Sequence, residues 1–149
     1  MIVGVGYFMT SKDTPLPIKT ETVQSPYSKS GDSELLNNIY ARLDTSYKNK
    51  DEEDECQLVA AYFVCDYYTF VDKKKNEIGG VDYMYPEMVE NFSQYAQTSF
   101  YSYKNQYPEL EVLKYNIISY SPSKVTIAGL EDNDYYNILI SLTFNEEIE

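Results

Sequence analysis

The sequence predicts an α+β fold in which three N-terminal helices pack on a curved, cone-like antiparallel sheet of three or four strands. Three observations carry this prediction. The length of 149 residues is typical of one domain, apolar residues recur at helical spacing before Pro108, and the period changes to two after it. We expect a single domain over residues 33–145, with an apolar tail (1–9), a flexible linker (10–32) and an acidic tail (146–149) outside it.

Residues 1–9 (MIVGVGYFM) are apolar but fall short of the ~20 residues that a membrane-spanning helix needs. Two alternatives remain for them: a short strand or tail, or the last turns of a membrane helix that begins upstream. Residues 11–32 are rich in Pro, Ser, Thr and Lys, which predicts an extended tether. The tether favours the second alternative, because an anchor followed by a tether carries a domain away from a bilayer.

Three helices are expected next. Residues 33–48 repeat leucine and isoleucine on one face behind a Ser33 or Asp32 cap. A second helix follows the acidic run 51–55 and extends to about residue 72; it is apolar nearly all round, so we expect it in the middle of the fold, closed by the lysines 73–75. Pro86 begins a third helix that Pro108 stops. Its apolar stripe comprises Met88, Val89, Phe92, Tyr95, Ala96, Ser99, Phe100 and Tyr103.

Three strands complete the predicted order. Residues 110–120 and 124–130 are rich in β-formers and are separated by a Ser-Pro-Ser turn at 121–123. After a hairpin loop at 131–134, the last strand (136–144) alternates most cleanly of all. One face of the sheet is therefore expected to pack on the helices. That face carries Tyr136, Ile138, Ile140, Leu142 and Phe144.

Composition excludes several functions. The chain has 17 tyrosines and no histidine, which removes the commonest general base and transition-metal ligand. A net charge of -12 with a single arginine, Arg42, argues against binding to nucleic acid or to an anionic membrane surface. The acids at 51–55 lack the EF-hand pattern and suit a helix N-terminus, so we expect no metal and no cofactor. Cys56 and Cys65 would lie roughly 13 Å apart on one helix, too far for a disulfide.

The order of the elements over residues 33–144 resembles the nuclear-transport-factor-2-like (cystatin-like cone) fold. With the N-terminal anchor and tether, the chain is also similar to extracytoplasmic domains of Gram-positive conjugation proteins and to the scaffold subunit of type IV secretion machines. In those proteins the segment matching residues 62–68 (YFVCDYY) is an aromatic helix, and the segment matching 90–101 packs beside it. The Gly-Gly-aromatic loop at 79–83 is similar to that of uncharacterised proteins from low-GC Gram-positive bacteria.

This resemblance implies a membrane-anchored assembly part rather than an enzyme, placed outside the membrane; a cytoplasmic location is the alternative. Its partners would be proteins of the cell envelope or further copies of the chain. Cone folds have four or more strands, so either a strand lies beyond this sequence or the sheet takes one from a partner. Tyrosine provides contact area at low entropic cost, and the tyrosines expected to reach a partner are Tyr83, Tyr85, Tyr101, Tyr103 and Tyr107.

Two other functions remain open. One is a cone-fold enzyme or small-ligand-binding protein with an apolar pocket around Asp66, the only acid inside the central helix, with Tyr62 and Phe70 as further pocket candidates. The competing interpretation of Asp66 is a structural acid that lies on a partly solvated stripe or bonds a tyrosine hydroxyl or a neighbouring lysine. The other function is a soluble acidic regulator of a basic partner, whose binding would weaken strongly with salt.

Overall fold

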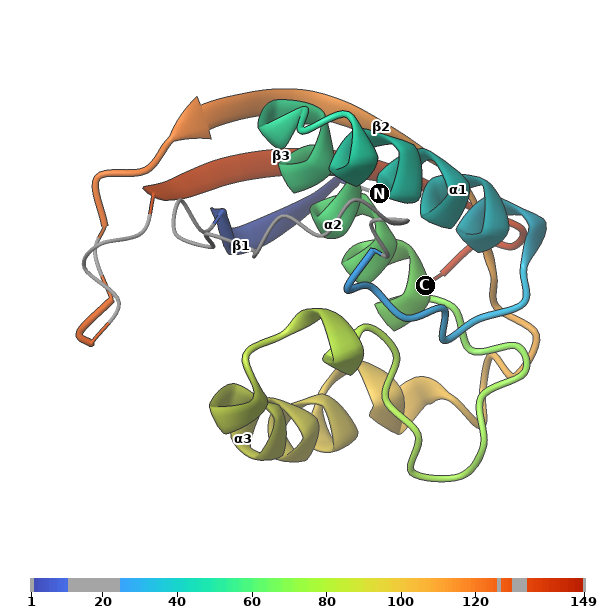
Figure 1. Cartoon of the computed structure of the whole chain (residues 1–149). Helices are drawn as coiled ribbons and strands as arrows, with labels where there is room; N and C mark the ends of the chain where they lie inside the picture. Colours follow the sequence, from blue (N-terminus) through green and yellow to red (C-terminus); the bar gives the residue numbers. More distant parts are fainter. Residues whose placement is uncertain (1, 11–24, 126, 130–133, 149) are drawn as a thin grey trace.

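The computed structural model of this chain describes residues 2–10, 25–125, 127–129 and 134–148. Within them the α+β class is confirmed, with three α-helices and an antiparallel sheet (Figure 1). The order begins with a strand rather than with a helix, which corrects the helix-first prediction. The elements are β1 (Ile2–Thr10), α1 (Glu34–Lys48), α2 (Glu52–Tyr67), η1 (Val81–Tyr83), α3 (Pro86–Thr98), η2 (Phe100–Tyr103), β2 (Val112–Pro122) and β3 (Asp134–Phe144).

Helix α1 forms as its sequence pattern predicts. The Ser33 hydroxyl oxygen accepts a hydrogen bond from the backbone N–H of Leu36, which satisfies one of the free donors of the first turn. Leu36, Ile39 and Leu43 recur at spacings of three and four and are all buried. These side chains place α1 against α2.

Helix α2 occupies the middle of the molecule, as predicted. Asp51 caps it by accepting from the backbone N–H of Asp54 at 3.1 Å, and acids fill its first turn, where the helix dipole favours them. The helix contacts α1 and all three strands. Figure 1 shows α2 between the sheet and α3, so both of its sides are covered.

Helix α2 ends at Tyr67, five residues before the predicted end, because the chain turns away to bond the start of β2. The Thr69 hydroxyl donates to the Cys65 carbonyl at 2.8 Å and accepts from the Val112 N–H at 3.1 Å. The N–H groups of Phe70 and Val71 both donate to the carbonyl of Leu110. The prediction that the lysines at 73–75 close this helix is therefore wrong.

The third predicted helix divides at Ser99. Helix α3 begins at Pro86 as expected but ends at Thr98, where Ser99 takes a non-helical conformation (φ -108°, ψ -110°) before the short η2. The Ser99 hydroxyl donates to the Tyr95 carbonyl at 2.7 Å and so competes with the helical backbone pattern. A continuous helix to Pro108 was the wrong expectation.

Strand β3 is the central strand of the sheet, whose order is β1-β3-β2 with antiparallel pairing on both sides. Ile138, Ile140 and Leu142 are buried while Asn137 and Thr143 are exposed, which confirms the predicted faces of this strand.

The middle strand predicted at 124–130 is wrong. Strand β2 continues through Ser121 and Pro122, so the predicted turn at 121–123 does not form. The residues described between 124 and 129 form no strand, and Gly129 takes a positive φ of 86°. The predicted hairpin loop at 131–134 falls almost wholly outside the described residues.

The N-terminal segment is a strand and not the last turns of a membrane helix, which corrects the alternative that the sequence favoured, because residues 2–10 form β1 against β3. Of the predicted linker, residues 11–24 lie outside the described part of the chain. In the part that the structure does describe, no helix combines the length and the apolar character that crossing a membrane requires.

Candidate functional site

Asp66 lies at a point where three segments meet, and only 1% of its surface is exposed. Its Oδ1 accepts from the ammonium group of Lys73 at 2.7 Å, in an ion pair buried on both sides. Its Oδ2 accepts from the Ser30 hydroxyl at 2.9 Å and from the backbone N–H of Gly80 at 2.8 Å. We call Asp66, Lys73, Ser30 and Gly80 the Asp66 hub. It joins α2 to a segment before α1 and to the loop after α2.

The segment before α1, residues 25–32, binds along α2, and we call it the strap. The Tyr62 hydroxyl accepts from the backbone N–H groups of Ser30 (2.9 Å) and Gly31 (3.2 Å). The Tyr40 hydroxyl donates to the carbonyl of Tyr27 at 3.3 Å. A Cβ on Gly31 would lie 2.3 Å from Cδ1 of Leu36, so glycine allows this close approach. The last part of the predicted linker is therefore held by tyrosines.

Three tyrosine rings stack where the strap crosses the fold. The ring of Tyr83 lies 4.4 Å from that of Tyr62, nearly parallel, and 5.7 Å from that of Tyr27. The Tyr83 hydroxyl donates to the carbonyl of Ser28 at 2.9 Å, and the Tyr27 hydroxyl donates to the carboxylate of Glu55. Burial raises the pKa of both Tyr27 and Tyr83, and the bond to Glu55 raises that of Tyr27 further. These hydroxyls therefore stay protonated donors.

The two glycines after α2 allow their loop, residues 76–85, to approach α2 closely, and we call it the glycine loop. A Cβ on Gly79 would lie 2.2 Å from the carbonyl oxygen of Asp66. Gly80 has a φ of 82°, a conformation that other residues rarely adopt, and a Cβ there would meet Phe63. The close approach brings the N–H of Gly80 to the carboxylate of Asp66.

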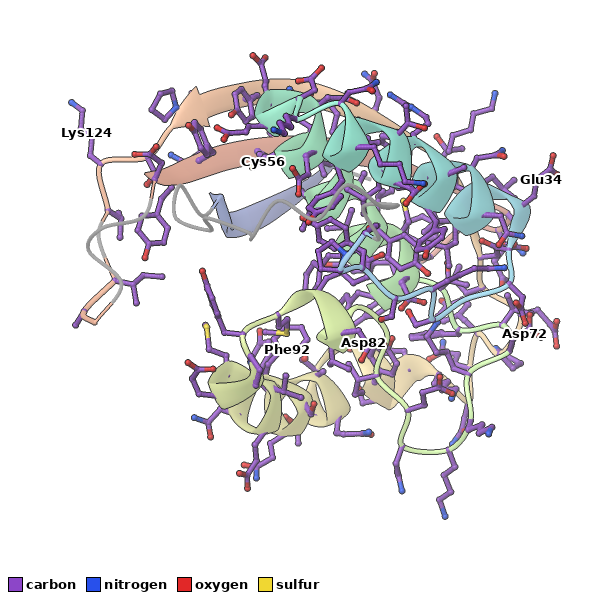
Figure 2. All side chains as sticks on the ribbon, in the orientation of Figure 1. Glu34, Cys56, Asp72, Asp82, Phe92 and Lys124 are labelled. Atoms are coloured by element: carbon purple, nitrogen blue, oxygen red, sulfur yellow. The ribbon has the colours of Figure 1, made fainter. Side chains whose placement is uncertain are left out.

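A cluster of aromatic rings connects α2 to α3 and η2. The ring of Phe92 lies 5.4 Å from that of Tyr67, and Figure 2 shows Phe92 on the side of α3 that faces α2. Phe70 stacks on Phe100 at 4.7 Å. The Tyr101 hydroxyl donates to the carbonyl of Tyr67 at 2.7 Å and accepts from the N–H of Gly79 at 2.8 Å. This cluster therefore holds the far side of α2 together through rings and hydroxyls.

The apolar stripe of the third helical region is only partly covered. Ala96 is buried and Phe92 packs on the core, but Tyr95 is 65% exposed, Tyr103 is 52% exposed and Met88 is 47% exposed. We call Met88, Tyr95 and Tyr103 the α3 surface. Met88 and Tyr95 are seven residues apart and so lie on one face of α3. Residues 91–108 hold no Asp or Glu, so the segment that carries the two tyrosines contributes no negative charge in a chain with a net charge of -12.

The predicted site residues divide between these features. Tyr62 and Asp66 come together at the strap, whereas Phe70 belongs to the aromatic cluster and does not join them. Of the residues expected to reach a partner, Tyr103 is exposed. Tyr101 is 5% exposed and bonds buried backbone groups, so it does not reach the surface, which corrects that expectation.

The other expected interface tyrosines are half-buried. Tyr83 lies in the ring stack, and Tyr85 and Tyr107 are only partly covered. Tyr95 is the residue that the sequence reasoning missed, because its place in the apolar stripe predicted burial. Ser30 and Lys73 were not predicted as partners of Asp66. A neighbouring lysine was expected beside Asp66, but which lysine was not. No pattern within residues 25–32 indicates that the strap binds α2.

The two cysteine thiols are buried and stay protonated at neutral pH. Cys56 and Cys65 form no disulfide with each other, as predicted, and both are buried. Burial, with the charge of Glu55, raises the pKa of the Cys56 thiol to about 12, and burial raises that of Cys65 as well. Among the residues that the structure describes, no group of acids and cysteines is arranged to hold a metal ion. The oxygens of Asp66 are committed to three donors, so this carboxylate holds segments together.

No family model matches this sequence, and neither the curated proteins nor the solved structures contain a match to it. The function must therefore be argued from the geometry of the chain itself.

Proposed function

We propose that this chain is a non-enzymatic interaction domain and that the α3 surface binds a protein partner. One observation carries the proposal: the rest of the fold covers only part of the apolar stripe of α3 and η2. Tyr95 and Tyr103, which belong to this stripe, are more than half exposed. Tyrosine is enriched at protein interfaces because a rigid ring gives large area and its hydroxyl tolerates water.

The charge distribution supports a protein partner at this surface. Residues 91–108 carry Lys104 and no acid, so a protein that contacts Tyr95 and Tyr103 meets no carboxylate from this segment. A partner that bound through charge alone would favour the acidic surfaces instead. The binding proposed here is therefore weakly dependent on salt.

The narrower form of the proposal is an extracytoplasmic scaffold domain of an envelope or conjugation-type assembly, with the cone-like fold of the nuclear-transport-factor-2-like proteins. The contacts of Phe92 with Phe63 and Tyr67 support it, because the resemblance implies packing of residues 90–101 beside the aromatic helix. The commitment of Asp66 to Lys73, Ser30 and Gly80 favours this role over a catalytic pocket.

Site-specific photo-crosslinking in the cells that produce the protein tests the binding. A photoreactive phenylalanine derivative replaces Tyr95 or Tyr103, and the same derivative at exposed Asn38 on α1 is the control. We expect one protein adduct common to positions 95 and 103 and missing at 38. Adducts at all three positions, or at none, would count against the α3 surface.

The location is tested separately. Asn38→Cys adds an exposed thiol to a chain whose own cysteines are buried. We expect a membrane-impermeant maleimide to label this variant in intact cells. Labelling only after lysis would remove the extracytoplasmic part of the proposal and leave the binding surface untouched.

A further inference from the structure

The strap and the glycine loop share two partners on α2, Asp66 and Tyr62. The carboxylate of Asp66 accepts from Ser30 of the strap and from the backbone of Gly80 in the loop, through the same oxygen atom. The ring of Tyr83, which belongs to the loop, stacks on Tyr27 of the strap. Removing the strap therefore takes away contacts from the glycine loop as well as from α2.

The glycine loop in turn positions η2 and α3. The N–H of Gly79 donates to the hydroxyl of Tyr101 in η2. The ammonium group of Lys104, directly after η2, donates to the carbonyls of Lys73 and Lys74, at 2.8 and 2.6 Å. Only Met84 and Tyr85 separate η1 from α3, which also contacts η1. A displacement of the loop must therefore reach both elements of the α3 surface.

The sheet side of the molecule does not bond Asp66 or Tyr62 in the part of the chain that the structure describes, although Tyr85 of the glycine loop lies near Tyr135 of β3. Its link to α1 is made by Arg42, which donates to the Tyr115 hydroxyl on β2 at 2.8 Å. Neither residue touches the strap or the glycine loop among the contacts described above. The strap thus bonds α1, α2 and the glycine loop, and its described hydrogen bonds include none to β2 or β3.

We propose that docking of the strap controls the order of the α3 surface. With residues 25–32 bound to Tyr62 and Asp66, the glycine loop is fixed and α3 and η2 are held in place. Release of the strap loosens the loop first and the α3 surface with it, while the sheet keeps its structure. The use of this coupling to regulate partner binding rests on the proposed function, but the coupling itself does not.

Amide hydrogen exchange on the whole chain tests the coupling, since it measures local opening element by element. Ser30→Ala removes the hydroxyl bond to Asp66, and Tyr27→Leu in the same chain removes the ring contact with Tyr83, together with a bond to Glu55 on α2 and a ring contact with Tyr47 on α1. Of these, only the Ser30 bond and the Tyr83 contact act on the glycine loop. We expect exchange to rise roughly tenfold in residues 79–98, the size that the loss of about one hydrogen bond and one ring contact produces. Exchange in β2 and β3 should stay unchanged.

Tyr115→Phe is the matched control, because it deletes a tyrosine hydroxyl that joins α1 to β2 and leaves the strap intact. It should not change exchange in residues 79–98. The coupling must also act in reverse, so Tyr83→Leu should release the N–H groups of Ser30 and Gly31, which Tyr62 protects in the parent chain.

Two results would overturn the inference: faster exchange confined to the strap in the Ser30→Ala/Tyr27→Leu chain, or an equal rise in the sheet. If Tyr83→Leu does not fold, Ser30→Ala alone decides the matter through the amides of residues 79–84. A failure of the crosslinking at positions 95 and 103 would leave this exchange result standing, so the two proposals fail independently.

Discussion

The two sides of α2 are held by different kinds of side chain. Toward α1 and the sheet the core is mainly aliphatic, built from residues such as Leu43, Val64 and Ile140. Toward α3 it is mainly aromatic, built around Tyr67, Phe70, Phe92, Phe100 and Tyr101. Aliphatic side chains pack without needing partners, whereas each buried tyrosine hydroxyl must find one.

The α3 side combines directional bonds with an uncovered stripe. The Tyr101 hydroxyl bonds two backbone groups there. The strap is fixed from both sides, by the hydroxyl of Tyr83 in the glycine loop and by those of Tyr62 on α2 and Tyr40 on α1. The same tyrosine-rich chemistry leaves Tyr95 and Tyr103 at the surface. The aliphatic side is therefore closed by packing, whereas the aromatic side is held by hydrogen bonds and leaves part of its apolar stripe exposed.

The largest effect is expected at the Asp66 hub, where the two sides meet. Asp66→Asn leaves the buried ammonium group of Lys73 without its counter-charge, so the free energy of unfolding should fall by about 3–5 kcal/mol. Adding Lys73→Met removes the unpaired charge and should recover part of this loss. Urea unfolding of the three chains measures both. A double variant no more stable than Asp66→Asn would mean that the ion pair is not the main contribution of Asp66.

On the aliphatic side, truncation should act through lost packing. Ile140 is fully buried in the central strand, and Ile140→Ala should lower the free energy of unfolding by about 2–5 kcal/mol. The loss should spread over the sheet in hydrogen exchange. A cost below that range would show that the strand can collapse around the deleted atoms.

On the aromatic side, removal of one hydroxyl should cost less and act locally. Tyr101→Phe keeps the ring but leaves the N–H of Gly79 and the carbonyl of Tyr67 without their partner, which should cost about 1–3 kcal/mol. Tyr103→Phe, at an exposed position in the same short helix, is the control and should change stability by less than about 0.5 kcal/mol. Equal losses in the two variants would contradict the bonding role of Tyr101.

The two sides should begin to lose stability at different pH values, because a cysteine thiol has a lower ordinary pKa than a tyrosine hydroxyl. Burial raises the pKa of Cys56 from 9.0 to about 12 on the aliphatic side and that of Tyr67 from 10.0 to about 12 on the aromatic side. Because the folded state holds these protons more tightly than the unfolded state, their stabilisation is complete below pH 9 and is lost as pH rises toward 12.

Urea unfolding at pH 8 to 12 measures this decline. In Cys56→Ala/Cys65→Ala, which removes both buried thiols, the onset should move from about pH 9 to about pH 10, because Tyr67 and the other buried tyrosines then begin it. An onset that does not move would show that neither thiol contributes.

The sequence predicted the helical elements well where burial follows a local period. The spacing of Leu36, Ile39 and Leu43 is that of one helix face, and it predicted α1. The apolar residues on all sides of α2 predicted a central helix. Strand β2 was harder, because its pairing with β3 shifts between Val112 and Lys114 and again between Ile117 and Ser119. The two bulges place Leu113 and Ile118 at the surface and break the strict alternation that strand prediction relies on.

The candidate site was less predictable, because its contacts join distant parts of the chain. Asp66 was recognisable as an acid in an apolar helix, but Ser30 lies 36 residues before it and bonds it only in the folded chain. The strap resembles any polar linker in composition. Tyr95 was misplaced for the opposite reason: it fits the apolar stripe, yet no described element covers it.

The central claim is that Tyr95 and Tyr103 serve binding and not folding. The most direct measurement uses Tyr95→Ser/Tyr103→Ser, with a photo-crosslinking residue at Met88 of the same surface. We predict that its unfolding free energy stays within about 0.5 kcal/mol of the parent, while the yield of the partner adduct falls at least tenfold. An unchanged adduct yield in a stable protein, or loss of stability in place of binding, would contradict the account.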